Sequence, residues 1–149
     1  DAVHKLRDDT GLPGMAILHF AYGSGDDNPY LPDNVCENNV IYTGTHDNDT
    51  TVSWYEKLDD DSAHHVRVAL SCSGENIAWD LSCAAMRAPS KMAIVPLQDL
   101  FGLGEEARFN TPGTGMGNWQ WRYNAGQLED LRQSKTGEIK QLLQETNRV

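Results

Sequence analysis

Three short apolar runs, separated by polar and helix-like segments, constrain the fold of this chain most. They span residues 15–22, 40–45 and 92–97, and each ends at glycine or at polar residues. Runs of this length that are almost continuously apolar are typical of strands buried on both faces, as in a parallel sheet. Buried strands that alternate with helices favour right-handed βαβ units. The sequence therefore predicts an α/β fold built on a parallel sheet.

The segments between and around these runs have helical spacing or turn composition. Helices are predicted over 1–9, 50–58, 63–70 and 75–88, with Asp61 or Ser62 as the N-cap of the third. A terminal helical region over 128–149, broken near Gly137, is expected after a structured surface loop at 109–122. The segment 23–39 is rich in Gly, Pro, Asp and Asn, and predicts a long loop at the end of the first strand.

A parallel sheet of three strands alone would leave two exposed edges, which is unfavourable. The chain also begins inside a predicted helix, without an initiator Met. We therefore expect a fragment: the C-terminal three β/α modules of a TIM (β/α)₈ barrel. On this interpretation residues 1–149 are part of one catalytic domain, with 123–149 as a terminal helical segment.

Polar side chains lie at the end of each predicted strand. His19 lies within the first run, His46 and Asp47 follow the second directly, and Asp99 follows the third. The C-terminal ends of barrel strands converge on one face, which predicts an active site built from several strands. For Asp49 and Asp99 a local capping role is an equal alternative. The sequence has no His-x-x-x-His or Cys-x-x-Cys spacing, so no metal site is expected.

The charge and the aromatic content narrow the class of substrate. A net charge of −10 argues against nucleic acid or an anionic membrane as the main partner. It fits a neutral substrate such as carbohydrate, on which Trp119, Trp121, Tyr22 and Tyr30 could stack, although core packing is the alternative for each. A carboxylate beside an imidazole also suits glycoside chemistry, whose transition state is oxocarbenium-like. The odd number of cysteines, 3, argues against a disulfide framework.

Six sequence blocks together carry a family resemblance over about residues 3–122. They are Gly11-Leu12-Pro13-Gly14-Met15, Leu18-x-Phe20-Ala21, Asn28-Pro29-x-Leu31-Pro32, Tyr42-x-Gly44-Thr45-His46-Asp47-Asn48-Asp49-Thr50, Pro96-Leu97-Gln98-Asp99 and Glu106-Ala107-Arg108-Phe109-Asn110-Thr111-Pro112-Gly113. In this order they resemble the 4-α-glucanotransferases, that is, the amylomaltases or disproportionating enzymes of glycoside hydrolase family 77. The resemblance implies a retaining enzyme that moves a 1,4-α-glucan segment between maltooligosaccharides through a covalent glycosyl-enzyme, without metal or organic cofactor.

The resemblance also assigns roles to single residues. It places the carboxylate that stabilises the transition state at Asp47, and substrate contacts at His46 and Asn110. The nucleophile and the acid/base would lie upstream of residue 1, so the isolated chain is expected to be inactive. Three departures are His19, where the family usually has Gln, Cys36, in a loop where the family commonly has Pro or another residue, and Phe109, where Met is commoner. His19 could alter substrate contact or be a tolerated change in the core.

The partner implied by the resemblance is a maltooligosaccharide or a glucan derived from starch or glycogen, with no nucleic acid and no membrane. The implied location is the cytoplasm, or the plastid in a plant or alga. Two alternatives stay open on the sequence. One is a non-catalytic carbohydrate-binding homologue, and the other is a hydrolytic relative of the α-amylase type.

Overall fold

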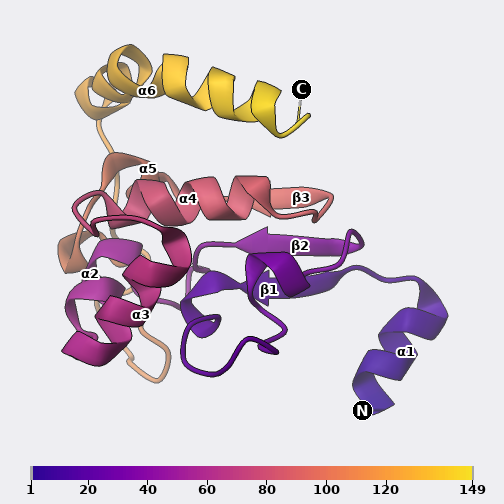
Figure 1. Ribbon diagram of the computed structural model, residues 1–149. Helices are drawn as coiled ribbons and strands as arrows, with labels where there is room; N and C mark the ends of the chain where they lie inside the picture. The colour runs from indigo at the N-terminus through magenta and orange to yellow at the C-terminus, as the bar shows by residue number, and fades with distance from the viewer. Residues whose placement is uncertain (1, 149) are drawn as a thin grey trace.

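The computed structural model describes residues 2–148 and contains a three-stranded parallel sheet (Figure 1). The strands are β1 (Gly14–Ile17), β2 (Asn39–Tyr42) and β3 (Met92–Ile94), in the order β1-β2-β3. Ile41 in β2 is in register with Ala16 on one side and with Ala93 on the other. The predicted α/β fold with a parallel sheet is therefore confirmed.

Helices precede, separate and follow these strands in the chain. They are α1 (Ala2–Thr10), α2 (Thr51–Glu56), α3 (Asp60–Leu70), α4 (Ile77–Arg87), α5 (Leu97–Phe101) and α6 (Ala125–Glu145), with short 3-10 turns η1 (Leu18–Phe20), η2 (Pro32–Asn34) and η3 (Glu105–Ala107). Helix α4 lies along the sheet, and α6 lies on the far side of α4 (Figure 1). As far as the chain is described, no helix is both long and apolar enough to cross a membrane.

One face of the sheet holds the core. Ala16 and Ile41 point toward the helices and are buried, together with Leu81 and Ala85 of α4. Successive side chains of a strand point to opposite faces, so Met15 and Met92 point the other way. Their exposed fractions are 57% and 53%. The expectation that these strands are buried on both faces is therefore wrong for residues 2–148, because helices pack against only one side.

The first and third apolar runs are strands only in part. The first leaves the sheet after Ile17 and continues as η1, and the third leaves it after Ile94. Helix α1 ends at Thr10, and Gly11 follows with φ +68, a conformation that glycine commonly adopts just after a helix. Position 1, where that helix was predicted to begin, lies outside the described residues.

Helices α3 and α6 differ from the sequence prediction, the first in where it begins and the second in its continuity. Helix α3 begins at Asp60, and its N-cap is Asp59, whose carboxylate accepts a hydrogen bond of 2.9 Å from the backbone N–H of Ser62. Helix α6 continues through Gly137 without the predicted break. A glycine inside a helix costs only about 1 kcal/mol. The capping box of Asn124 and Gln127 and the burial of Leu142 stabilise α6 against that cost.

Candidate functional site

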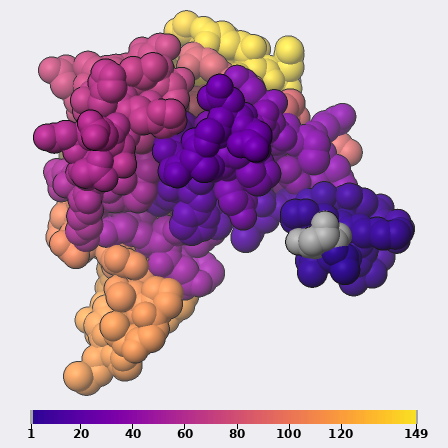
Figure 2. Space-filling model, turned by 60° about the horizontal axis from the view of Figure 1, so that its bottom comes forward, coloured from indigo at the N-terminus to yellow at the C-terminus, as the bar shows by residue number. Residues whose placement is uncertain are grey.

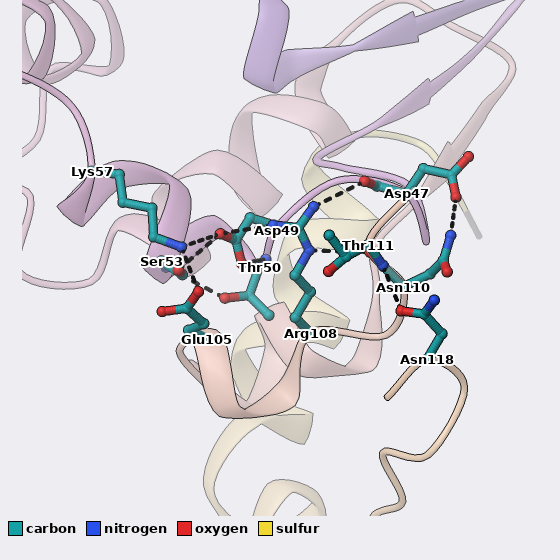
Figure 3. Close-up of polar contacts among 10 residues, drawn as sticks. All are labelled: Asp47, Asp49, Thr50, Ser53, Lys57, Glu105, Arg108, Asn110, Thr111 and Asn118. Carbon is teal, nitrogen blue, oxygen red and sulfur yellow. Dashed lines mark hydrogen bonds and ion pairs between the residues drawn. The ribbon is translucent and has the colours of Figure 1, made fainter. Parts of the chain in front are cut away.

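Two loops meet at the end of the sheet where the strands terminate. The first, residues 43–50, follows β2, and the second, residues 108–118, follows η3. The side-chain amide of Asn110 donates a hydrogen bond of 2.6 Å to Oδ1 of Asp47, as Figure 3 shows. This contact joins residues that are 63 positions apart, and it defines the candidate site.

A buried carboxylate lies beneath the first loop. Asp99 of α5 is 3% exposed, and it accepts hydrogen bonds from the Thr43 hydroxyl at 2.5 Å and from the Thr51 hydroxyl at 2.8 Å. The backbone N–H of Thr51 donates to its other oxygen at 2.9 Å. Burial raises the pKa of Asp99 above its ordinary value, although these hydrogen bonds oppose the rise. Asp99 is thus enclosed by threonines that are 48 and 56 residues away in the chain, so its role is not the local cap that the sequence left open.

His19 is part of the same buried network. Its Nε2 lies 3.0 Å from the Thr51 hydroxyl oxygen, whose own proton is donated to Asp99, so Nε2 carries hydrogen and donates. The ring stacks on Trp54 with centroids 4.6 Å apart. Burial lowers the pKa of His19 to about 4, with the Asp49 charge opposing. The imidazole is therefore neutral at pH 7 and belongs to the core, so a direct substrate contact by His19 is not supported.

The turn at residues 45–48 presents His46 and Asp47 to solvent. Oδ1 of Asn48 accepts hydrogen bonds from the backbone N–H and the hydroxyl of Thr45, at 2.9 and 2.8 Å. The turn is thereby closed behind the two residues, whose side chains are 59% and 52% exposed. His46 Nε2 lies 3.4 Å from Asp47 Oδ1. The structure therefore brings together the three predicted site residues, Asp47, His46 and Asn110.

Asp49 points away from Asp47 and is held by several donors. Its side chain is 10% exposed and accepts hydrogen bonds from Lys57 at 2.7 Å and from Ser53 at 3.0 Å (Figure 3). Lys57 also contacts Glu105 of η3 at 2.9 Å. Partial burial works against ionisation, but the hydrogen bonds from Lys57 and Ser53 hold the pKa of Asp49 below its ordinary value. Asp49 is therefore a charged anchor at the start of α2.

Trp119 forms an aromatic surface beside the site. Its backbone has φ +63, a conformation that is uncommon for a large side chain. Its backbone N–H donates to the backbone carbonyl of Phe109 at 2.8 Å, and the Phe109 ring meets the indole edge-on at 5.0 Å between centroids. The His46 ring lies 5.3 Å away, and Trp119 remains 51% exposed. A non-glycine residue holds such a conformation only where its surroundings fix it.

The other aromatic candidates for a sugar surface lie away from Asp47. Tyr22 is buried, Tyr30 packs against the core, and Trp121 lies next to Tyr123.

A cavity of about 630 Å³ adjoins the site on the open face of the sheet, and its lining includes Met15, Phe20, Tyr42, His46, Asp47 and Ile94. Across residues 2–148 no cluster of three potential metal ligands occurs.

Arg108 is a residue of the site that sequence reasoning did not single out, like Thr43, Thr51, Ser53 and Lys57. Its guanidinium lies 3.4 Å from Asp49 and donates to the backbone carbonyls of Asn110 and Asp47, at 3.1 and 3.4 Å. The only sequence signal was its position inside the last of the six blocks, two residues before Asn110.

Comparison with known proteins decides the family. The family model described as 4-alpha-glucanotransferase matches residues 1–129. The chain belongs to the 4-α-glucanotransferase family. The resemblance drawn from the six sequence blocks is thus confirmed.

Relatives in bacteria and plants agree with this assignment. The 4-alpha-glucanotransferase of Synechocystis is 48% identical over 130 residues, which cover 86% of this chain and 26% of that protein. The chloroplastic/amyloplastic 4-alpha-glucanotransferase of Arabidopsis thaliana is 44% identical over 142 residues, covering 95% of this chain and 25% of that protein. The chain thus spans about a quarter of the length of the curated relatives it matches.

Solved structures are similar as well. The amylomaltase from Streptococcus agalactiae in complex with acarbose has a TM-score of 0.89 and 29% identity, and the match covers 99% of this chain and 30% of that one. The amylomaltase from Corynebacterium glutamicum has a TM-score of 0.60 at 16% identity, which supports the fold alone.

Proposed function

We propose that this chain is the C-terminal part of a 4-α-glucanotransferase, in which it forms the last three β/α modules of a (β/α)₈ barrel. The whole enzyme transfers a 1,4-α-glucan segment between maltooligosaccharides with retention of configuration. Membership of the family and the parallel sheet support this proposal. The complex of the Streptococcus agalactiae amylomaltase with acarbose supports a substrate of the α-glucan type.

The observation that carries the proposal is the contact between Asp47 and Asn110 at the end of the strands. Both Asn110 and His46 contact Oδ1 of Asp47, and no hydrogen bond from residues 2–148 reaches Oδ2. A half-exposed carboxylate with one oxygen held and the other open can accept hydrogen bonds from sugar hydroxyls. Such bonds, and the negative charge itself, stabilise an oxocarbenium-like transition state.

The nucleophile and the acid/base are assigned to residues upstream of this chain. A retaining mechanism needs two carboxyl groups about 5 to 5.5 Å apart on either side of the scissile bond. The three other carboxylates near the site do not fit these roles, because Asp99 is enclosed and both Asp49 and Glu105 are bound to Lys57. We therefore expect the 149-residue chain alone to have no transferase activity.

Trp119 is the aromatic surface proposed for the glucan. Its ring is half-exposed, is held by Phe109, and lies beside His46. The apolar face of a glucose unit can pack on such a ring while its hydroxyls bind His46, Asp47 and Asn110. The proposed location is the cytoplasm, or the plastid in a plant or alga, as in the chloroplastic/amyloplastic relatives.

The test uses the full-length enzyme that contains this chain, with maltotriose as substrate. Transferase activity produces glucose together with longer oligosaccharides. The substitution Asp47→Asn should lower kcat by about 10²- to 10³-fold, because it removes a preorganised charge at the transition state. Asp130→Asn, at an exposed position of α6, is the matched control.

Four results would contradict parts of the proposal. Near-native turnover by the Asp47→Asn enzyme would refute the role of Asp47. Products from the purified 149-residue chain would refute the upstream assignment of the nucleophile and the acid/base. Glucose without longer oligosaccharides would identify a hydrolase, and the absence of both products would favour a non-catalytic carbohydrate-binding homologue.

A further inference from the structure

The guanidinium of Arg108 lies between the two loops of the site and contacts both. Nε donates to the carbonyl of Asn110 at 3.1 Å, and Nη2 donates to the carbonyl of Asp47 at 3.4 Å. Nη1 lies 3.4 Å from Oδ2 of Asp49. Figure 3 shows the guanidinium between these partners. Because the guanidinium is rigid and planar, three contacts in different directions fix the relative position of the groups it binds.

On Asp47 and Asn110 these contacts are made to the main chain and not to the side chains. Arg108 binds the main-chain carbonyls of Asp47 and Asn110, the two residues whose side chains meet at 2.6 Å. The charge of Arg108 is directed to Asp49, which also binds Lys57. The carboxylate of Asp47 is therefore held in place without a neutralising Arg or Lys partner, and it keeps its charge for the substrate.

The second loop depends on this connection because it extends away from the rest of the molecule. The segment that follows Arg108 forms a projecting lobe in the space-filling view (Figure 2). Within the lobe, the side chain of Asn118 accepts from the N–H of Thr111 and donates to the carbonyl of Thr114. These bonds order the lobe internally, whereas Arg108 and Asn110 connect it to the loop that carries Asp47.

We propose that Arg108 and Asp49 are positioning residues for glucan transfer, with Asp49 anchoring the Arg108 guanidinium so that it holds Asp47 and Asn110 in their catalytic arrangement. This inference rests on the proposed role of Asp47. It adds two residues that act through Asp47 and Asn110 and that do not themselves touch the reacting sugar.

The test is a double-mutant cycle in the full-length enzyme, with kcat and KM for maltotriose as readouts. Arg108→Lys keeps the positive charge but removes the planar set of donors. It should lower kcat about 10-fold, because small displacements of a catalytic group cost rate steeply. In an Asp47→Asn background the same substitution should change kcat less than about 2-fold, since residues that act as a unit are not additive.

Asp49→Asn is the second variant, because it leaves Arg108 in place and removes only the anchoring charge. Its kcat should also fall when Asp47 is present and should change little in the Asp47→Asn background. Arg132→Lys is the matched control, since Arg132 pairs with Glu129 on the exposed surface of α6. Thermal unfolding of each variant separates loss of positioning from loss of the fold.

Each outcome decides between the alternatives. A kcat loss that is present with Asp47 and absent without it supports the inference. An equal loss in both backgrounds, or no loss in either variant, overturns it while leaving the role of Asp47 intact. If Asp47→Asn itself has no effect, the proposed role of Asp47 and this inference both fail.

Discussion

Because the imidazole of His19 is buried, we predict that its contribution to the free energy of unfolding falls between pH 7 and pH 4. Burial lowers the pKa of His19 from 6.5 to about 4. Below pH 6.5 the unfolded chain binds a proton at this position, whereas the folded chain does not do so until the pH approaches 4. The contribution of His19 to stability is thus fully present above pH 6.5 and is lost as the pH falls. At 1.36 kcal/mol per pKa unit, the loss amounts to about 3 kcal/mol.

Asp99 has the opposite effect on the pH dependence of stability, and its contribution must be separated from that of His19. Burial raises the pKa of Asp99, so the folded state takes up a proton before the unfolded state does, and acid favours folding at this site. The pH dependence of the unsubstituted chain contains both contributions. The difference between this chain and a His19→Gln variant isolates the histidine, because Asp99 is present in both proteins.

The assay is urea unfolding of the two proteins at a series of pH values from 4 to 7.5. The stability of the unsubstituted chain relative to His19→Gln should decrease by about 3 kcal/mol toward pH 4. His65→Gln, at an exposed position of α3, controls for the loss of a histidine. A stability difference that stays constant within about 0.5 kcal/mol over this range would refute the reasoning, as would an NMR titration of the His19 ring near pH 6.5.

Two further predictions concern the same network. Gly44→Ala places a Cβ 2.7 Å from Cε1 of His19, so urea unfolding should show a loss of about 1 to 3 kcal/mol in the free energy of unfolding. Gly115→Ala is the control, because no atom lies within 4 Å of the added Cβ. Equal losses in the two variants would contradict this prediction. Thr51→Val removes the hydroxyl between His19 and Asp99 and should cost about 2 to 3 kcal/mol, because buried polar partners stay unsatisfied. Exposed Thr114→Val is its control, and an equally small change in both would show that the hydroxyl is dispensable.

The sequence predicted the parallel sheet well because its signal is local. Each apolar run contains a strand, although β1 and β3 end inside their runs, after Ile17 and Ile94. The exposure of Met15 and Met92 could not be read from the same pattern, since an apolar side chain does not reveal whether anything covers its face. The N-cap of α3 is Asp59 and not Asp61 or Ser62. Residues 59–61 are three consecutive aspartates, and the sequence does not distinguish which of them has the backbone geometry of a cap.

The site was predictable only to the extent that it lies in recognisable blocks. Asp47, His46 and Asn110 were named from such blocks, and the structure brings them into contact, while their roles stay a proposal. The contact of Arg108 with the Asp47 carbonyl joins positions 61 residues apart, a relation that no periodicity encodes. His19 was noticed as a departure, but its burial against Trp54 depends on the path of the chain after β1.

The position of Thr51 has a consequence for folding kinetics. Its hydroxyl joins His19, 32 residues away, to Asp99, 48 residues away, and Asp99 in turn binds Thr43 across 56 residues. Closing loops of this size costs entropy before any of these bonds is gained. We therefore expect the network to form after the transition state for folding. Substitutions in it should mainly accelerate unfolding and leave the folding rate almost unchanged. A set of hydrogen bonds that forms late thus slows unfolding and extends the lifetime of the folded chain.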